Sequence, residues 1–412
     1  MKIIDDLKAL NRDQRATFIA SALGWTLDAF DFFLMVFIVK AIAKDYQVSK
    51  EDVLWGITLT LMFRPLGALF FGRLADRFGR RPILMINVLT FSFFELASAF
   101  APSLTVFLVL RALFGFAMGG EWGIGSSLVM ESIPAQSRGT VSGILQEGYA
   151  FGYLLAAVVY GLLFNLIGWR GMFIVGVVPA LLVFYIRMSV KESPVWEQHQ
   201  LRIDLPPLSV SVRRHWKAFL YMILLMTAFT FFSHGTQDIY PLFLQEQHQL
   251  STSAVSAIAI IANIGAIIGG ITVGFFSQRI GRRRAIIIAA LLALPIIPLW
   301  AFSTTPLFLG LGAFLIQICV QGAWGVVPAH LNELSPDELR GTFPGFAYQL
   351  GNFLACYNAT LQGWIAARHG HNYGLALALV AAVAAVSVAM MAALGKEARH
   401  VTFGETPARA KT

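Results

Sequence analysis

Charge is scarce in this sequence. Asp, Glu, Lys and Arg together supply only 13% of its 412 residues, whereas 57% are apolar, and the mean hydropathy is +0.67. A soluble domain carries roughly 25% charged residues, so about half of the usual solvated surface is missing. This composition excludes a soluble enzyme and a disordered chain. Because one membrane span needs about 20 apolar residues, it predicts an all-α protein that crosses a membrane around a dozen times.

Cysteine and catalytic motifs are also scarce. The two cysteines, Cys319 and Cys356, both fall within apolar stretches, which argues against a structural disulfide or a metal site. The sequence has no HExxH, no GxSxG and no GxxxxGK[ST] motif, and its N-terminus lacks the pattern of a signal peptide. We therefore expect no enzyme activity, no cofactor and no metal.

The net charge of +8 is explained by membrane topology. Most of the 31 Lys and Arg residues lie in the termini and alternate loops, and the opposite loops hold only Lys40, Lys44, Lys50, Arg170 and Arg368. Since cytoplasmic loops carry an excess of Lys and Arg, both termini are predicted to be cytoplasmic. We expect a multi-pass protein of the bacterial inner membrane, surrounded by lipid and without a nucleic-acid partner.

Apolar runs between polar stretches predict twelve transmembrane helices. The predicted spans are residues 16–40, 53–75, 82–101, 104–130, 139–163, 170–188, 217–245, 252–276, 285–303, 306–331, 340–366 and 372–395. The longest polar stretch follows the sixth span and contains three prolines. It divides the chain into a bundle at 1–190, a cytoplasmic linker at 191–216 and a second bundle at 217–412.

An internal repeat supports this division. Residues 72–81 (GRLADRFGRR) recur at residues 274–283 (GFFSQRIGRR), a shift of 274 − 72 = 202 positions. The same shift relates four further pairs, which are Trp122 and Trp324, Glu131 and Glu333, Pro134 and Pro336, and Arg138 and Arg340. One constant offset across these positions indicates a duplication.

The loop motif at 72–81, its weaker copy and the RxxxGxxxG segment at 111–119 resemble the major facilitator superfamily. The resemblance covers nearly the whole chain. It implies two six-helix bundles around a central cavity, with alternating access by rocking of the two halves. We expect such a carrier to work as a monomer.

The loop motif also supplies candidates for gating. Its glycines allow close helix approach and a tight turn, and its basic residues hold the loop in the cytoplasm. Asp76 is placed to accept from the amino end of a helix in the other half, which would stabilise the outward-facing state. The alternative is that the basic residues only anchor the topology. The gating candidates are Gly72, Asp76, Arg77, Gly79, Arg80 and Arg138.

Ionisable side chains inside the predicted spans are costly and mark candidate functional sites. They are Asp28, Asp31, Glu95, Glu121, Glu147 and Asp238, together with Arg64, Arg111 and His234. Asp28 and Asp31 lie three residues apart on one helical face, where two close carboxylates repel each other. At least one of them is therefore expected to carry a proton, unless one forms a structural ion pair with Arg64 or Arg111.

Arg64 is the best candidate for holding an anionic substrate. It lies in the middle of a predicted span, and its guanidinium offers a planar fork suited to a carboxylate. The repeat maps it to Ala266, so the fold does not require this charge in both halves. The alternative is a structural pair with Asp28, Asp31 or Glu121.

The seventh span contains the cluster SHGTQD at residues 233–238. His234 and Asp238 are one turn apart, and a histidine beside a carboxylate suits reversible proton loading. The cluster resembles the signature of Jen-type monocarboxylate permeases within the sialate:proton symporter group, although Thr230 and Leu242 depart from the full signature. The resemblance implies roles for His234, Gln237 and Asp238, with Ser233 and Thr236 as weaker lining candidates.

Further polar residues complete the predicted site. Gln349 and Asn352 in the eleventh span, and Gln146 and Tyr149 in the fifth, are candidates to hydrogen-bond a substrate. Such groups equally serve to hold membrane helices together.

The function we expect is proton-coupled import of a small monocarboxylate such as lactate or pyruvate. The predicted partners are thus a small organic anion and a proton. Arg64 would receive the carboxylate, and His234, Asp238, Asp28 or Asp31 would carry the proton. The alternative is a larger organic acid such as sialate, or an aromatic acid.

Overall fold

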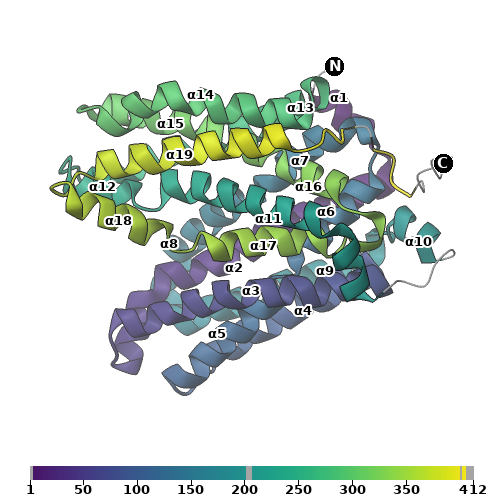
Figure 1. Cartoon of the computed structure of the whole chain (residues 1–412). Helices are drawn as coiled ribbons and strands as arrows, with labels where there is room; N and C mark the ends of the chain where they lie inside the picture. The colour runs from purple at the N-terminus through teal and green to yellow at the C-terminus, as the bar shows by residue number, and fades with distance from the viewer. Residues whose placement is uncertain (1–2, 201–206, 400, 405–412) are drawn as a thin grey trace.

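The computed structural model describes residues 3–200, 207–399 and 401–404, and this part of the chain is helical throughout, with no strand (Figure 1). The first half contains α1 (Ile3–Lys8), α2 (Arg12–Tyr46), α3 (Lys50–Phe78), α4 (Arg80–Ala99), α5 (Leu104–Met118), α6 (Glu121–Ser132), α7 (Arg138–Gln146), α8 (Gly148–Val175) and α9 (Pro179–Ser189). The second half contains α11 (Leu208–Gln237), α12 (Tyr240–Glu246), α13 (Thr252–Ile280), α14 (Arg282–Phe302), α15 (Pro306–Trp324), α16 (Val327–Leu334), α17 (Phe343–Leu354), α18 (Asn358–Arg368) and α19 (Tyr373–Leu394), and α10 (Pro194–Gln200) lies between the halves.

Ten segments of the described residues are long and apolar enough to cross a membrane. This differs from the twelve predicted spans for two reasons. Residues 135–189 form one continuous stretch that includes two predicted spans, and the predicted span at 340–366 is divided into α17 and α18, which have 12 and 11 residues. The number of twelve spans therefore stays a prediction. The expectation of many apolar helices long enough to cross a membrane agrees with the structure.

The repeat is visible in the helices. α3 and α13 both have 29 residues, and both end at a glycine with positive φ, namely Gly79 (φ 104°) and Gly281 (φ 101°). Only glycine adopts this conformation readily, so each copy of the loop motif turns sharply into the next helix. α3 packs against α5 in the first half and α13 against α15 in the second.

Several long helices are broken near their middle. α5 ends before Gly119 and Gly120, α7 and α8 are separated by Glu147, and α11 ends at Gln237 before α12 begins at Tyr240. The predicted seventh span at 217–245 agrees with these two helices, because α11 begins at Leu208 but is kinked at His215, and α12 ends at Glu246. Broken helices at membrane depth require backbone groups to be satisfied inside the protein, so the breaks face other helices rather than lipid.

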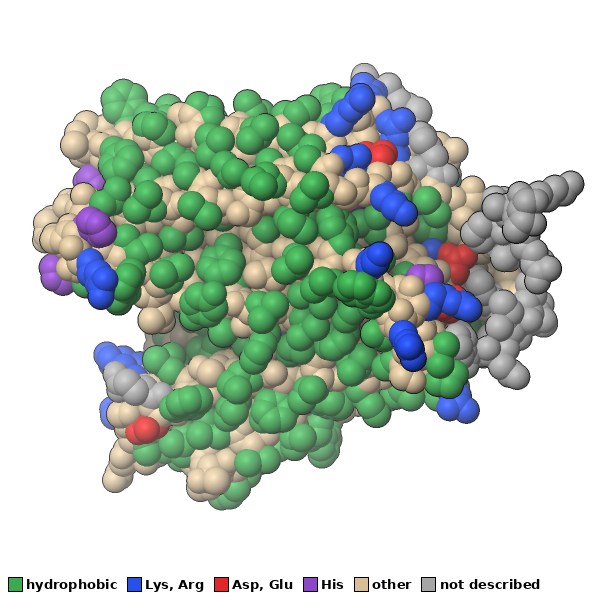
Figure 2. Space-filling view, in the orientation of Figure 1, with side chains coloured by type: hydrophobic (Ala, Val, Ile, Leu, Met, Phe, Trp, Pro, Cys, Tyr) green, Lys and Arg blue, Asp and Glu red, His purple; other side chains and the backbone are tan. Residues whose placement is uncertain are grey.

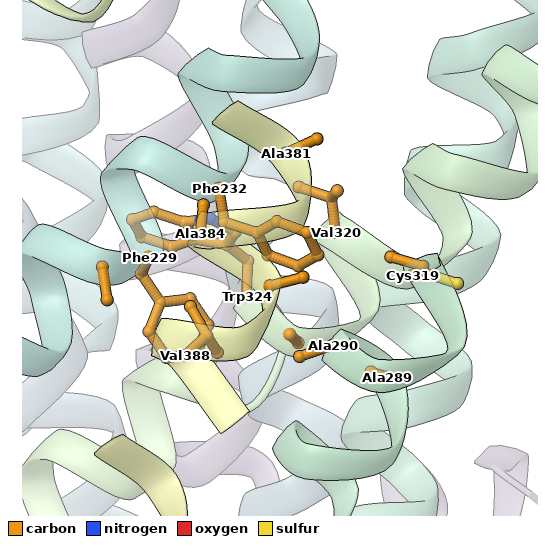
Figure 3. Close-up of a cluster of buried hydrophobic side chains, with 14 of the residues drawn as sticks. Phe229, Phe232, Ala289, Ala290, Cys319, Val320, Trp324, Ala381, Ala384 and Val388 are labelled. Atoms are coloured by element: carbon orange, nitrogen blue, oxygen red, sulfur yellow. The ribbon is translucent and has the colours of Figure 1, made fainter. Parts of the chain in front are cut away.

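The largest core lies in the second half. Aromatic side chains of α11 and α15, including Phe229, Phe232 and Trp324, meet small residues of α14 and α19 such as Ala290 and Ala384 (Figure 3). The small side chains let the backbones approach closely, as is usual where membrane helices pack. Cys319 is buried in this core and Cys356 is exposed, and both are free thiols.

Both chain ends lie at the same end of the bundle, which we call the terminal face (Figure 1). Figure 2 shows a broad band of hydrophobic side chains between this end and the opposite face, with Lys and Arg gathered toward the ends. At the opposite face the molecule is hollowed between the two halves (Figure 2).

Candidate functional site

Arg64 is buried in the middle of α3, where its guanidinium meets one carboxylate. Its Nη2 lies 3.4 Å from Asp28 Oδ2 of α2 and 2.6 Å from Met118 Sδ, and the guanidinium carbon lies 5.3 Å from the centre of the Phe32 ring. Arg64 Nε is buried without a hydrogen-bond partner among the described atoms. The contacts of the fork are therefore made by Nη2, and its one carboxylate contact at hydrogen-bond distance is the long one to Asp28.

Glu95 and Asp31 form a second group around Arg111, whereas Glu121 lies within electrostatic range of Asp28 and Arg64. Arg111 Nη1 lies 2.6 Å from Glu95 Oε2, and both side chains are almost fully buried. Asp31 lies on the side of Glu95 and Arg111 rather than of Arg64, and the carboxyls of Asp31 and Glu95 both lie close to Gly176. Asp28 and Asp31 thus share a helix but have different partners.

His234 and Asp238 form a pair at the end of α11. His234 Nδ1 lies 2.9 Å from Asp238 Oδ1, and the two side chains are 45% and 33% exposed. They are accessible because α11 ends at Gln237, next to the helix break. The pair is open to solvent in this conformation, in contrast to Arg64.

The neighbours of this pair mainly tie helices together within the second half. Gln237 Nε2 donates to Gln317 Oε1 (2.9 Å), and Gln317 Nε2 donates to Thr236 Oγ1 (3.2 Å). Gln321 Nε2 donates to Ser233 Oγ (3.4 Å). The sequence reasoning missed Gln317 and Gln321 of α15. Both lie on one face, four residues apart, and that spacing was the available signal.

Thr230, Asn352 and Gln349 form a second chain between α11 and α17. Thr230 Oγ1 donates to Asn352 Oδ1 (2.9 Å), and Asn352 Nδ2 donates to Gln349 Oε1 (3.3 Å). Gln349 is buried. These polar groups satisfy each other in this conformation, which is the helix-packing role anticipated for them.

Aromatic rings from both halves meet where the two halves contact each other. Trp122 of α6 stacks on Tyr348 of α17 with ring centres 4.4 Å apart, and Trp25 of α2 lies 6.3 Å from the same tyrosine. Tyr149 stacks on Trp25 (5.8 Å), and Trp324 lies 5.6 Å from Tyr348. We call these five residues the aromatic cluster, and Tyr149 is the one that the sequence analysis named as a site candidate.

Gln146 anchors the aromatic cluster from α7. Its Oε1 accepts from Trp122 Nε1 (3.2 Å), and its backbone carbonyl accepts from Trp25 Nε1 (3.3 Å). Buried indole N–H groups usually need such partners. Gln146 therefore fixes the ring positions instead of facing open space.

Three of the predicted charged residues lie within electrostatic range of Tyr149. This phenol lies close enough to interact electrostatically with Arg64 and Asp28 of its own half and with Asp238 of the other half. Asp31 is not brought to this point. The structure thus places Arg64, Asp28 and Asp238 around one region between the halves.

The two halves are in contact at the terminal face. Asp76 Oδ1 accepts from the Gly341 backbone N–H (2.7 Å) and its Oδ2 accepts from Thr342 Oγ1 (2.5 Å), just before α17 begins. Arg80 lies 3.2 Å from Asp76. A Cβ on Gly72 would lie 2.8 Å from the Gly341 carbonyl, so the glycine permits this approach.

Buried ion pairs surround this contact. Arg80 lies 3.1 Å from Glu131, and Arg282 lies 2.9 Å from Glu333, so the repeat also relates the two pairs. Arg340 of the second half lies 3.6 Å from Glu131 of the first. The sequence repeat showed that Glu131 and Glu333 are equivalent, but it did not show that Glu131 pairs with an arginine of the other half.

The remaining gating candidates, Arg138, Arg77 and Gly79, have other contacts than the Asp76 contact between the halves. Arg138 Nη1 donates to the Val401 carbonyl (2.8 Å), and its guanidinium covers the Phe403 ring, so it ties down the C-terminal segment. Arg77 lies over the Phe78 ring. Gly79 provides the turn after α3.

Comparisons with known proteins identify the family. The family model described as Major Facilitator Superfamily matches residues 20–356 and 236–411. The chain is 28% identical over 378 residues to the sialic acid transporter NanX of Escherichia coli (91% of this chain, 93% of the relative). It is 31% identical over 357 residues to a probable 4-methylmuconolactone transporter of Cupriavidus pinatubonensis (84% and 82%).

A longer relative and a solved structure agree with this. A carboxylic acid transporter protein homolog of Saccharomyces cerevisiae is 29% identical over 392 residues, which cover 89% of this chain but only 64% of that protein. The proton:xylose symporter XylE has the same fold, with a TM-score of 0.78 at 18% identity, over 95% of this chain and 98% of that one. The expected superfamily is confirmed: the chain belongs to the Major Facilitator Superfamily, whose members are transporters rather than enzymes.

Proposed function

We propose that this transporter is a proton symporter for a small monocarboxylate such as lactate or pyruvate. The observation that carries the proposal is the arrangement of Arg64. A permanently charged fork lies buried with one long carboxylate contact, to Asp28, with Glu121 within electrostatic range and with one nitrogen unpartnered. A buried guanidinium needs an anion, and a substrate carboxylate can supply both oxygens where Asp28 supplies one.

Asp28 couples this exchange to a proton. When Asp28 takes up a proton, its attraction for Arg64 falls and the guanidinium becomes available to the substrate. One proton and one monoanion then enter together, so the net charge of the site is unchanged. Transport should follow the pH gradient more than the membrane potential.

His234 and Asp238 are the second proton-loading group. Their side chains are partly exposed, and Asp238 lies within electrostatic range of Tyr149. A proton from solvent reaches this pair before it reaches Asp28, which is buried. This supports a sequence in which the exposed pair receives the proton and the buried pair responds to it.

The terminal face supplies the gate. Asp76 and the start of α17 hold the halves together there, while the opposite face is open. With the termini in the cytoplasm of a bacterial inner membrane, this is the outward-facing state of a monomer. Substrate release requires the Asp76 contacts to break.

The relatives support an organic acid but favour no single size. NanX is named for sialic acid, and the Cupriavidus protein for 4-methylmuconolactone. The second candidate is therefore a larger or aromatic acid, and the aromatic cluster is the observation that favours it. Trp122 and Tyr348 are stacked on each other in this conformation, and their faces become available to a substrate ring when the halves separate.

The test is uptake by proteoliposomes that contain the purified protein. An inward proton gradient should drive accumulation of labelled lactate, and an imposed membrane potential alone should not. Labelled sialate and benzoate, tested in parallel, decide between the two size classes. If none of these carboxylates accumulates, the proposed function is wrong.

A further inference from the structure

Glu147 is an acid that the proposed transport cycle has not used. It is the single residue between α7 and α8, in the middle of a predicted span. Its side chain is 2% exposed, and its Oε1 is buried without a hydrogen-bond partner among the described atoms. A buried carboxyl in this position calls for an explanation, since such groups are nearly always paired.

The carboxyl of Glu147 lies against the other half of the protein. A Cβ on Gly270 of α13 would overlap Glu147 Oε1 and would lie 2.7 Å from its Cδ. The same stretch of α13 also meets Gly143 of α7, where a Cβ would lie 3.1 Å from Ile271 Cα. Glu147 is thus part of the surface along which α7 and α13 close the terminal side.

The helices around Glu147 offer it no counter-charge. α13 carries Arg279 alone, next to its terminal end, and α15 has Cys319 as its one titratable group. On the other neighbouring helices, the titratable groups away from the ends of α2 are Asp28 and Asp31, and the ends of α2 carry Arg12, Asp13, Arg15, Lys40, Lys44, Asp45 and Tyr46. The remaining ones are Glu121 and Glu131 on α6, Arg138 on α7, Tyr149, Tyr153, Tyr160 and Arg170 on α8, and His330 and Glu333 on α16. Among the described residues, no hydrogen bond or ion pair joins any of these groups to Glu147.

An ionised carboxylate is not stable in such a place. Removing it from water without a partner costs many kcal/mol, and a group in this position becomes neutral instead. When the halves part at the terminal face, the Gly270 contact is lost and water reaches the carboxyl, which then ionises. Closure therefore binds a proton and opening releases one.

We propose that Glu147 is a proton-binding site whose occupancy is tied to closure of the terminal face. The inference deepens the proposed function and rests on proton coupling. It adds a further proton-carrying residue, which releases its proton toward the terminal face when that face opens. The repeat places Gln349 at the equivalent position of the second half (147 + 202 = 349), so the device exists in one half only.

The experiment measures opening of the terminal face without any substrate. Spin labels are attached at Phe78 and Ile280, the exposed and repeat-related ends of α3 and α13, after Cys319→Ala and Cys356→Ser. Double electron–electron resonance then gives the closed and open populations from about pH 5 to about pH 8, a range above the ordinary carboxyl values. The protein with Glu147 should show a closed-to-open ratio that falls with rising pH, by up to about tenfold per unit for one proton.

Glu147→Gln mimics the protonated acid and should stay closed across this range. Glu147→Met, which fills the same space with an apolar chain, repeats the test independently of the amide. Glu95→Gln is the matched control, because Glu95 is also a buried acid of the first half but contacts Gly176 of its own half and has no role in the proposed transport cycle. It should keep the pH dependence of the parent.

The inference is overturned if the parent shows no pH dependence, or if both Glu147 variants keep it unchanged. Carboxylate uptake plays no part in this measurement. A failure of the proposed function in proteoliposomes and a failure of this inference are therefore distinguishable.

Discussion

Asp28→Asn tests the link between the proton and the substrate. The substitution keeps the shape of the side chain but makes it permanently neutral, as a protonated Asp28 would be. Arg64 then loses its carboxylate partner, which approaches it to 3.4 Å in the structure. We expect the variant to bind substrate without first taking up a proton.

The size of the effect follows from that single contact. A hydrogen bond between charged groups contributes about 1.5–3 kcal/mol, which corresponds to about 10- to 150-fold in affinity. In the parent protein, one required proton weakens carboxylate binding by up to about tenfold for each pH unit in the alkaline range. Asp28→Asn should therefore bind the acid more tightly than the parent at alkaline pH and no more tightly at acid pH.

The assay is calorimetric titration of the purified protein with lactate at several pH values, beside uptake in proteoliposomes. The variant should exchange labelled substrate across the membrane but fail to accumulate it against a gradient. Asp28→Asn with the parent's pH dependence would refute the reasoning, as would a variant that accumulates substrate normally. Either result would make the Asp28 pair purely structural.

Four further substitutions separate the roles of site and gate. Arg64→Lys keeps the charge but loses the fork, so KM for uptake should rise at least about tenfold; parental kinetics would assign Arg64 to scaffolding. Asp238→Asn should abolish proton-driven uptake at unchanged expression, and full accumulation would exclude Asp238 as a carrier. Asp76→Asn loses charge-assisted bonds and should shift the spin-label populations toward the open terminal face by about tenfold or more, whereas an unchanged distribution would show that Asp76 does not hold the gate. Gly143→Ala drives a methyl into α13 and should likewise open this face, which cross-linking of the two halves would reveal.

The fold was largely predictable because its signals are local. Apolar runs and the repeated loop motif indicated the helices, and α3 and α4 lie within a few residues of their predicted spans. The helix breaks were missed. At Glu147 nothing in the apolar pattern changes between α7 and α8, because both sides of the break are buried among other helices.

The site was only partly predictable, since it depends on contacts between distant segments. The ionisable residues inside spans were visible one by one, but the sequence did not show that Asp28 faces Arg64 while Asp31 faces Glu95 and Arg111. These choices depend on helix rotation, which small differences in packing decide. The aromatic cluster was missed for the same reason, because its rings come from both halves.

The glycine contacts between the halves have a consequence for the energetics of the cycle. Where backbone meets backbone, as between Gly123 and Gly345 or Gly139 and Gly274, no rotatable groups have to be frozen when the surfaces join. Ordering a long side chain costs up to about 2 kcal/mol at room temperature, and a seam of glycines avoids this cost. The two end states can therefore remain near equal in free energy, so that a solute gradient of ordinary size is enough to drive turnover in either direction.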